Sequence, residues 1–320
     1  MVLLEVDSLR VYYFTSKGVV KAVDNITLNL KRSESLGLAG ESGCGKSTFG
    51  FSLLRLVPPP GRIVGGKIIY DGTNILEIDE ETFRKNYRWK RIAMVFQGAM
   101  NALNPVRRIG DQIVEAILAH DENVDEEAAY KRAGDLLELV GIDRIRVKSY
   151  PHELSGGMKQ RVVIAMALAL SPELLIADEP TTALDVVVQA QIMNLLKELK
   201  NKLKMSLILI THDLAIIAEV ADKVAVMYAG KIVEWGTSEQ IFLSPKHPYT
   251  AGLVASIPKL RGDKTLYWIP GQPPDLINPP PGCRFYSRCA KRMDICSKEE
   301  PPMIEVEPEH YVACWLYAKR

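Results

Sequence analysis

The sequence predicts an α/β protein with a mostly parallel sheet, an antiparallel β subdomain, an inserted helical subdomain and a loop-rich, cysteine-containing C-terminal extension. Residues 156–229 alternate continuous apolar strands with helices, which is typical of a buried parallel sheet. Residues 3–96 are mainly short strands separated by turns, whereas residues 101–149 carry apolar side chains at helical spacing. Ten of the 19 prolines lie between Pro258 and Pro308, which favours extended, loop-rich structure there.

Composition narrows the class of protein. The chain has 320 residues, 47% hydrophobic and 25% charged, and its 40 Lys and Arg against 39 Asp and Glu give a net charge of +1. These proportions exclude a disordered, collagen-like or fibrous protein, and they give no basic excess for binding nucleic acid. The longest apolar run, Val162–Leu170, is far shorter than the roughly 20 residues of a membrane helix. No basic-then-apolar leader opens the chain, so we expect a soluble, cytosolic protein with no nucleic-acid partner.

The N-terminal elements come first. Val2–Val6 and Ala22–Leu30 alternate apolar and polar residues as half-buried strands do, and Lys67–Tyr70 is a further strand that ends in a turn. Between them, the apolar strand Leu36–Ala39 leads through a glycine-rich turn into a helix from about Lys46 to Leu56. Antiparallel pairing fits these short, turn-bounded strands best.

The remaining elements follow in order. In the helical subdomain, about residues 98–155, Ile109, Ile113 and Ile117 recur four residues apart. Helices and strands then alternate, at Val162–Leu170, Leu174–Ala177, Val188–Leu203, Leu207–Ile210, 213–220 and 224–228. We expect a main domain over residues 1–243 and an extension over residues 244–320.

The turn after Leu36–Ala39 has the pattern of a phosphate-binding loop, Gly40-Glu41-Ser42-Gly43-Cys44-Gly45-Lys46-Ser47, with a strand before it and a helix after it. Its glycines let successive backbone N–H groups surround phosphate oxygens at the helix N-terminus. Lys46 can reach the β- and γ-phosphates, and Ser47 can ligate Mg²⁺. An ordinary glycine turn is the alternative. The predicted ATP-binding residues of this segment are Gly40, Ser42, Gly43, Cys44, Gly45, Lys46, Ser47 and Thr48.

Two acids end the strand Leu174–Ala177. Asp178 would lie near Mg²⁺, at the carboxyl edge where parallel sheets bind ligands. Glu179 could orient and deprotonate the attacking water. Two acids that simply end a strand are the alternative interpretation.

A second glycine-rich segment, Leu154–Gln160, opens a long helix with Ser155, Gly156 and Gly157. It would form another anion-binding site. One ATP does not need two such sites from one chain, so we expect this one to serve a nucleotide held by another subunit. A serine-capped helix start is the alternative.

Taken together, these motifs resemble the ATP-binding subunit of an ABC transporter, and Leu154–Gln160 matches the family's signature sequence. The resemblance implies a P-loop NTPase (RecA-like) core over residues 1–243. It further implies that Tyr13 stacks on adenine and that Gln97 contacts Mg²⁺ and senses the membrane partner. Asp185 matches the loop that crosses to the other subunit, and His212 matches the histidine that contacts the γ-phosphate.

The same resemblance implies a mechanism and partners. Two ATP-binding subunits, this chain with itself or a paralogue, would close head to tail around ATP and Mg²⁺. Glu179, His212, Lys46 and Gln97 would carry hydrolysis. Two transmembrane permease subunits and an extracytoplasmic solute-binding protein would complete the complex, with this chain peripheral on the cytoplasmic face of the membrane.

The C-terminal segments narrow the family. Lys246–Thr250, Pro281–Cys283 and Cys314–Leu316 are similar to the extension of oligopeptide/dipeptide importer ATPases, which implies peptide import. The alternatives are an importer of another solute (an oligosaccharide or a metal chelate), an exporter, a soluble ABC ATPase, or an iron–sulfur redox carrier with a vestigial cassette. The chain departs from the family pattern at Gly98-Ala99, where many relatives have Asp-Pro, and at Cys44, where Ser is common.

Four cysteines lie in the extension, Cys283, Cys289, Cys296 and Cys314, with the spacing C-x5-C-x6-C-x17-C. Paired C-x2–4-C knuckles typical of zinc are missing, whereas four thiolates are the usual complement of an iron–sulfur cluster. Some members of the importer family carry a [4Fe–4S] cluster there, and we expect one with a structural role. Zn²⁺, free thiols and disulfides are the alternatives.

Overall fold

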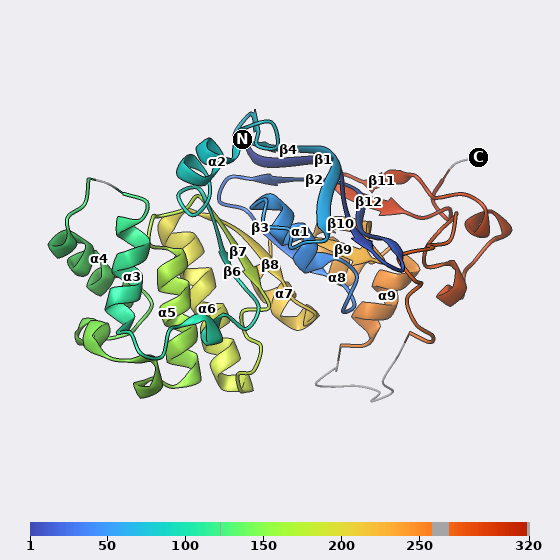
Figure 1. Ribbon diagram of the computed structural model, residues 1–320. Coiled ribbons are helices and arrows are strands. Elements are labelled where there is room, and N and C mark those ends of the chain that lie inside the picture. The colour runs from blue at the N-terminus through green and yellow to red at the C-terminus, as the bar shows by residue number, and fades with distance from the viewer. Residues whose placement is uncertain (122, 258–268, 319–320) are drawn as a thin grey trace. The chain divides into compact units, whose positions relative to one another are not determined.

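The computed structural model describes residues 1–121, 123–257 and 269–318 (Figure 1). The chain forms two compact units. Unit 1 combines Met1–Leu76 with Leu209–Arg320, and unit 2 is Glu77–Ile208. The predicted boundary at residues 243 and 244 falls inside unit 1 and stays a prediction. The α/β class is confirmed.

An antiparallel sheet forms the N-terminal part of unit 1. Its strands, in the spatial order β2-β1-β4-β5, are β1 (Val2–Thr15), β2 (Gly18–Lys31), β4 (Gly61–Tyr70) and β5 (Thr73–Asn74). The β1–β2 hairpin closes with Thr15 opposite Gly18. Apolar side chains such as Leu4, Val6 and Leu9 of β1 are buried, so this sheet has the alternation that the sequence predicts.

The second sheet of unit 1 contains β3 (Ser35–Ala39), β9 (Lys223–Tyr228), β10 (Lys231–Thr237), β11 (Met303–Glu307) and β12 (His310–Ala313). β3 and β9 pair in parallel, and every residue of β3 is buried. β10 pairs antiparallel with β9, β12 pairs with β10, and β11 pairs with β12. The C-terminal extension therefore adds two strands to the sheet that carries the phosphate-loop strand, a feature the sequence does not predict.

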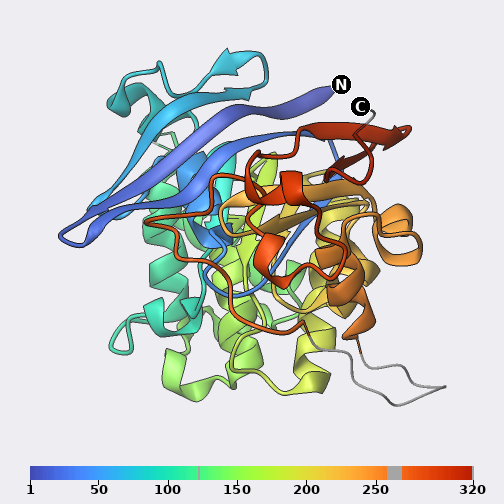
Figure 2. The same ribbon diagram turned by 90° about the vertical axis from the view of Figure 1, so that its right-hand side faces the viewer.

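The helices of unit 1 are α1 (Lys46–Leu53), α7 (Leu214–Val220), α8 (Ser238–Leu243), α9 (Pro248–Ala255), η4 (Tyr286–Arg288) and η5 (Asp294–Ser297). A regular helix, α9, lies inside the C-terminal extension, which we expected to be loop-rich. Pro248 is its first residue, a position where the missing N–H costs nothing. In Figure 2 the extension, drawn in orange to red, lies beside the N-terminal strands, and the ion pair between Lys31 and Glu309 joins the two.

Unit 2 contains the parallel strands β6 (Ile92–Val95) and β7 (Leu174–Asp178). Its helices are α2 (Glu80–Asn86), η1 (Ala99–Ala102), α3 (Ile109–Leu118), α4 (Glu126–Leu139), η2 (Arg144–Lys148), η3 (Pro151–Glu153), α5 (Gly156–Ala167) and α6 (Val186–Leu203). β8 (Ser206–Ile210) contains the boundary between the units. Ile109, Ile113 and Ile117 of α3 are fully buried, as their spacing predicts. In the part of the chain that the structure describes, no helix is long and apolar enough to cross a membrane.

Candidate nucleotide site and C-terminal cysteine segment

The glycine loop of unit 1 connects β3 to α1. Gly40, Gly43 and Gly45 have φ angles of 148°, 77° and 106°, which side-chain-bearing residues rarely adopt. A Cβ at Gly45 would lie 2.0 Å from the carbonyl oxygen of Ala22, and one at Gly40 would lie 2.1 Å from that of Met227. The loop can take this path only because these positions are glycine.

Lys46 folds back over the loop. Its side chain is buried, and its Nζ donates hydrogen bonds to the carbonyl oxygens of Gly40 at 2.7 Å and Glu41 at 2.9 Å. The ammonium therefore stands among the backbone groups of the loop, at the N-terminus of α1. A cation and helix N–H groups in this arrangement suit a phosphate ligand.

Four further predicted residues, Tyr13, Cys44, Thr48 and His212, lie in this unit. Tyr13 of β1 hydrogen-bonds through its hydroxyl to Thr48 Oγ1 of α1 at 3.2 Å. Cys44 is buried, and burial raises the pKa of its thiol although Lys46 opposes the shift. The thiol thus stays protonated and shielded, which makes it a poor target for oxidation. His212 is exposed and precedes Asp213, which caps α7.

In unit 2, Gln97 and Glu179 meet. Gln97 Nε2 donates to Glu179 Oε2 at 2.8 Å, and Thr182 Oγ1 donates to the same oxygen at 3.1 Å. Glu179 has a φ of 45°, an uncommon conformation for a side-chain-bearing residue and one that recurs at functional sites. Asp178 ends β7 and is 1% exposed. Gly98, the departure from the family pattern, has a φ of 68° before η1, where glycine is unstrained.

The signature segment opens α5. Ser155 Oγ accepts the N–H of Met158 at 3.3 Å, so the serine does cap the helix, yet Ser155 and Gly156 remain exposed. A Cβ on Gly157 would lie 2.6 Å from Val188 Cγ1 of α6. Asp185 caps α6 by accepting the N–H of the same Val188 at 3.0 Å. The signature segment and the Asp185 loop therefore pack against each other within one subunit.

The four cysteines of the extension lie in unit 1 as free thiols. Burial raises the pKa of Cys283 to about 12, the N–H of Phe285 opposes this shift, and the three other cysteines add to it. Burial likewise raises the pKa of Cys314 to about 11. Cys296 Sγ accepts the N–H of Met293 at 3.5 Å. Across the described ranges, no group of three or more His, Cys, Asp or Glu side chains is arranged to hold a metal ion.

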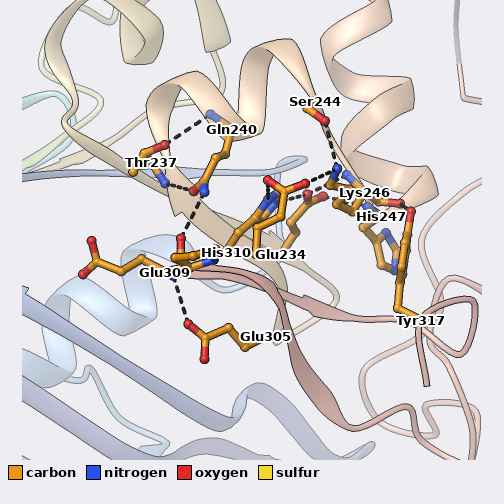
Figure 3. A network of polar contacts seen from close by, with 12 residues as sticks. Glu234, Thr237, Gln240, Ser244, Lys246, His247, Glu305, Glu309, His310 and Tyr317 are labelled. Atoms are coloured by element: carbon orange, nitrogen blue, oxygen red, sulfur yellow. Dashed lines mark hydrogen bonds and ion pairs between the residues drawn. The ribbon is translucent and has the colours of Figure 1, made fainter. Parts of the chain in front are cut away.

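A buried carboxylate ties the extension to β10 (Figure 3). Glu234, which is fully buried, accepts the N–H groups of Lys246 at 2.7 Å and His247 at 2.8 Å, and it bonds to His310 Nε2 at 2.8 Å. Burial lowers the pKa of His247 to about 4, and its Nδ1 accepts the N–H of Tyr249 at 3.1 Å. The sequence patterns do not predict this network. A lone Glu inside the apolar strand β10 was the available signal.

Two arginines of the cysteine segment, residues 283–296, have carboxylate partners that the sequence does not predict. Arg284 pairs with Asp24 of β2 and donates to the carbonyl oxygen of Ala229. Arg288 pairs with Glu41 of the glycine loop. Each arginine adjoins a cysteine, but its partner lies more than 200 positions away, so no local pattern points to it.

Comparison with known proteins places these features in a family. Residues 23–182 match the ABC transporter family, and residues 233–296 match the C-terminal region of oligopeptide/dipeptide transporters. The chain is 51% identical to the oligopeptide transport ATP-binding protein OppD of Bacillus subtilis, over 98% of this chain and 88% of that protein. It is 46% identical to the dipeptide transport ATP-binding protein DppD of Caldanaerobacter subterraneus, over 99% and 97%.

Two solved protein structures have folds similar to that of this chain. The ADP- and phosphate-bound dimeric ATP-binding cassette MJ0796 has a TM-score of 0.64 at 26% identity, covering 74% of this chain and 99% of that one. The cbiO1 protein of Clostridium perfringens, part of an ABC transporter complex, has a TM-score of 0.65 at 30% identity, covering 76% and 91%.

Proposed function

The chain belongs to the ABC transporter family of ATP-binding proteins, and from this premise we propose that it hydrolyses ATP to power the import of di- and oligopeptides across the cytoplasmic membrane. The observation that carries the proposal is the glycine loop between β3 and α1 with Lys46 folded over it. The peptide cargo rests on the similarity of the whole chain, extension included, to peptide-transport ATPases.

We propose the following residue roles, which the contacts described above support. Lys46 and the loop N–H groups bind the phosphates, and Tyr13 stacks on the adenine beside Thr48. The donor set Ser47, Gln97 and Asp178 offers the hard oxygen ligands that Mg²⁺ prefers, and bound Mg²⁺ would neutralise phosphate charge. Glu179, oriented by Gln97 and Thr182, aligns water and accepts its proton, while His212 contacts the γ-phosphate.

The second subunit completes the site. Ser155, Gly156 and Asp185 are exposed, and beside them the apolar Val186 and Val187 are 79% and 68% exposed. Exposed apolar side chains next to exposed helix N–H groups suit a partner that brings its own nucleotide phosphates. We propose a head-to-tail dimer with a paralogue or with this chain itself. Two permease subunits and an extracytoplasmic binding protein complete the complex at the cytoplasmic face.

The test of this function is Glu179→Gln. The variant should bind ATP normally while hydrolysis and peptide uptake fall at least about a hundredfold, because the general base is lost. Exposed Glu198 of α6 provides the matched control, Glu198→Gln, with unchanged hydrolysis. Near-normal hydrolysis by Glu179→Gln would remove Glu179 from this role.

Cargo is tested separately. Cells that lack this chain should lose uptake of labelled peptides and regain it with the wild-type gene. Uptake of an oligosaccharide or metal chelate instead would select the other importer alternatives. Co-purification with nucleic acid and not with permeases would select the soluble ATPase.

For the extension, we propose that the four thiols hold an iron–sulfur cluster with a structural role. The mutual influence of the thiols on the pKa of Cys283 supports it, as do the N–H groups aimed at the sulfurs of Cys283 and Cys296. Anaerobically purified protein should be brown, and Cys289→Ser should lose the colour and the iron. Unchanged iron content would contradict this ligand set.

A further inference from the structure

One contact joins the cysteine segment to the glycine loop. Arg288 ends η4 and adjoins Cys289, whereas Glu41 is the second residue of the loop. Arg288 Nη1 donates to Glu41 Oε2 at 2.7 Å, and Nη2 donates to Glu41 Oε1 at 2.9 Å. The two groups form a fork-to-fork pair, which fixes the plane of the carboxylate as well as its position.

The pair is largely removed from water. The Arg288 side chain is 5% exposed and that of Glu41 is 26% exposed. Arg288 also donates to the carbonyl oxygens of Ile269 at 3.2 Å and Pro270 at 2.9 Å, and to the Tyr228 hydroxyl at 3.3 Å. The guanidinium is therefore held by groups on several sides, so it is a fixed support and not a mobile surface charge.

The backbone of Glu41 is held by the same part of the chain. Its N–H donates to the hydroxyl oxygen of Tyr249 in α9 at 3.0 Å. Tyr249 is fully buried and packs against Tyr228 and Phe285, with ring centroids 4.5 and 5.3 Å away. Both the side chain and the main chain of this loop residue thus rest on the C-terminal extension.

Glu41 in turn supports Lys46. The Lys46 ammonium donates to the carbonyl oxygen of Glu41, on the same residue whose N–H and carboxylate the extension holds. A rotation of Glu41 would change the direction of that carbonyl and the place of the ammonium. Small displacements of groups that bind phosphate are costly, because their geometry must be set before the ligand arrives.

We propose that Arg288, together with Tyr249, positions the phosphate-binding loop through Glu41, so that the C-terminal extension sets the affinity of this chain for ATP. The inference rests on the proposed function, in which this loop binds the nucleotide. Arg288 is a positioning residue, because it acts on the phosphate-binding loop through Glu41.

The experiment uses the purified full-length chain. The dissociation constant of Mg·ATP is measured by titration with a fluorescent ATP analogue and competition with ATP, beside KM, kcat and Tm. Arg288→Gln should weaken ATP binding and raise KM about tenfold or more, the loss expected for a charged hydrogen-bonded pair, while kcat at saturating ATP stays within about twofold. Arg288→Lys should recover only part, because an ammonium cannot make the fork.

Two controls define the result. Arg292 lies three residues beyond Cys289, is exposed and stacks on Tyr286, so Arg292→Gln should leave ATP binding unchanged. Glu41→Gln should reproduce Arg288→Gln, and the double variant should be no worse than either single one, because the two residues act as one unit.

If Arg288→Gln does not fold, Tyr249→Phe replaces it. That variant keeps the ring and removes the one hydrogen bond to Glu41, and it should weaken ATP binding about fivefold.

The outcomes are separable. Wild-type protein that does not bind ATP would overturn the proposed function itself. Wild-type protein that binds ATP, with binding by Glu41→Gln and Tyr249→Phe within about twofold of it, would overturn this inference alone. Strictly additive effects of Glu41→Gln and Arg288→Gln, or a lower Tm with unchanged ATP affinity, would likewise overturn it and leave a purely structural pair.

Discussion

The glycine loop of residues 40–45 and the cysteine segment of residues 283–296, two irregular segments of unit 1, are held in different ways. Backbone conformations of its own glycines shape the glycine loop, together with the buried strand before it and the helix after it. The cysteine segment instead depends on partners far along the chain, such as Asp24 and Glu41. The path of the glycine loop depends mainly on its own glycines, with Glu41 held by the extension. The cysteine segment is specified by contacts that exist only after folding.

The difference separates two kinds of failure. A substitution in the glycine loop acts on the loop itself. A substitution of a residue that holds the extension in place disturbs a larger region. Because Arg288 and Tyr249 contact the glycine loop, the disturbance also extends to the loop. The following changes test whether the two segments can be disturbed independently.

The largest effect is expected from Gly45→Ala. Its Cβ would lie 2.0 Å from the carbonyl oxygen of Ala22, and the φ of 106° is unfavourable for alanine, so the loop must move. We expect this distortion to cost about 3 kcal/mol of binding free energy, which weakens ATP binding by about a hundredfold or more. Titration with ATP measures it. Gly65→Ala is the control, since a Cβ there meets nothing within 4 Å. Normal binding by Gly45→Ala would contradict a locally specified loop.

A smaller effect is expected from Glu234→Gln. The amide can accept fewer of the hydrogen bonds from Lys246, His247 and His310 than the buried carboxylate does. Loss of charged hydrogen bonds should lower the free energy of unfolding by about 2 to 3 kcal/mol. Amide hydrogen exchange should rise first at β12 and α9. Exposed Glu239→Gln, five residues along, is the matched control. Equal protection in wild type and Glu234→Gln would show that this carboxylate is no anchor.

The smallest effect is the pH dependence of the same anchor. Burial lowers the pKa of His247 to about 4, against about 6.5 in the unfolded chain. The unfolded state therefore binds more protons between these values, so stability is fully present above about pH 6.5 and falls as the pH drops toward 4. Between pH 7.5 and 5 the loss is about 2 kcal/mol.

Denaturant unfolding at several pH values measures this loss. His247→Asn should flatten the slope, while exposed His152→Asn in unit 2 should not change it. A slope that His247→Asn leaves intact would assign the pH dependence to other groups.

Much of the fold and of the candidate site was predictable. The strand β3, the glycine loop and helix α1 follow one another within 20 residues, and each has a local pattern of its own. The buried spacing of α3 and the caps at Ser155 and Asp185 are equally local. The family assignment made from these motifs is confirmed by the comparisons. The iron–sulfur cluster stays a prediction, because the spacing of the four cysteines along the chain does not fix where their sulfur atoms lie in space.

What the sequence determined by itself is the set of segments whose geometry depends on neighbours in the chain: glycine conformations, helix caps and apolar periodicity. Only the tertiary structure decided that the extension contributes β11 and β12 to the sheet, that Glu234 anchors it, and that Arg288 reaches Glu41 across 247 positions. The physical reason is that long-range partners are selected by the packing of the whole unit, and neither arginine nor glutamate carries a local signal of which opposite charge it will meet.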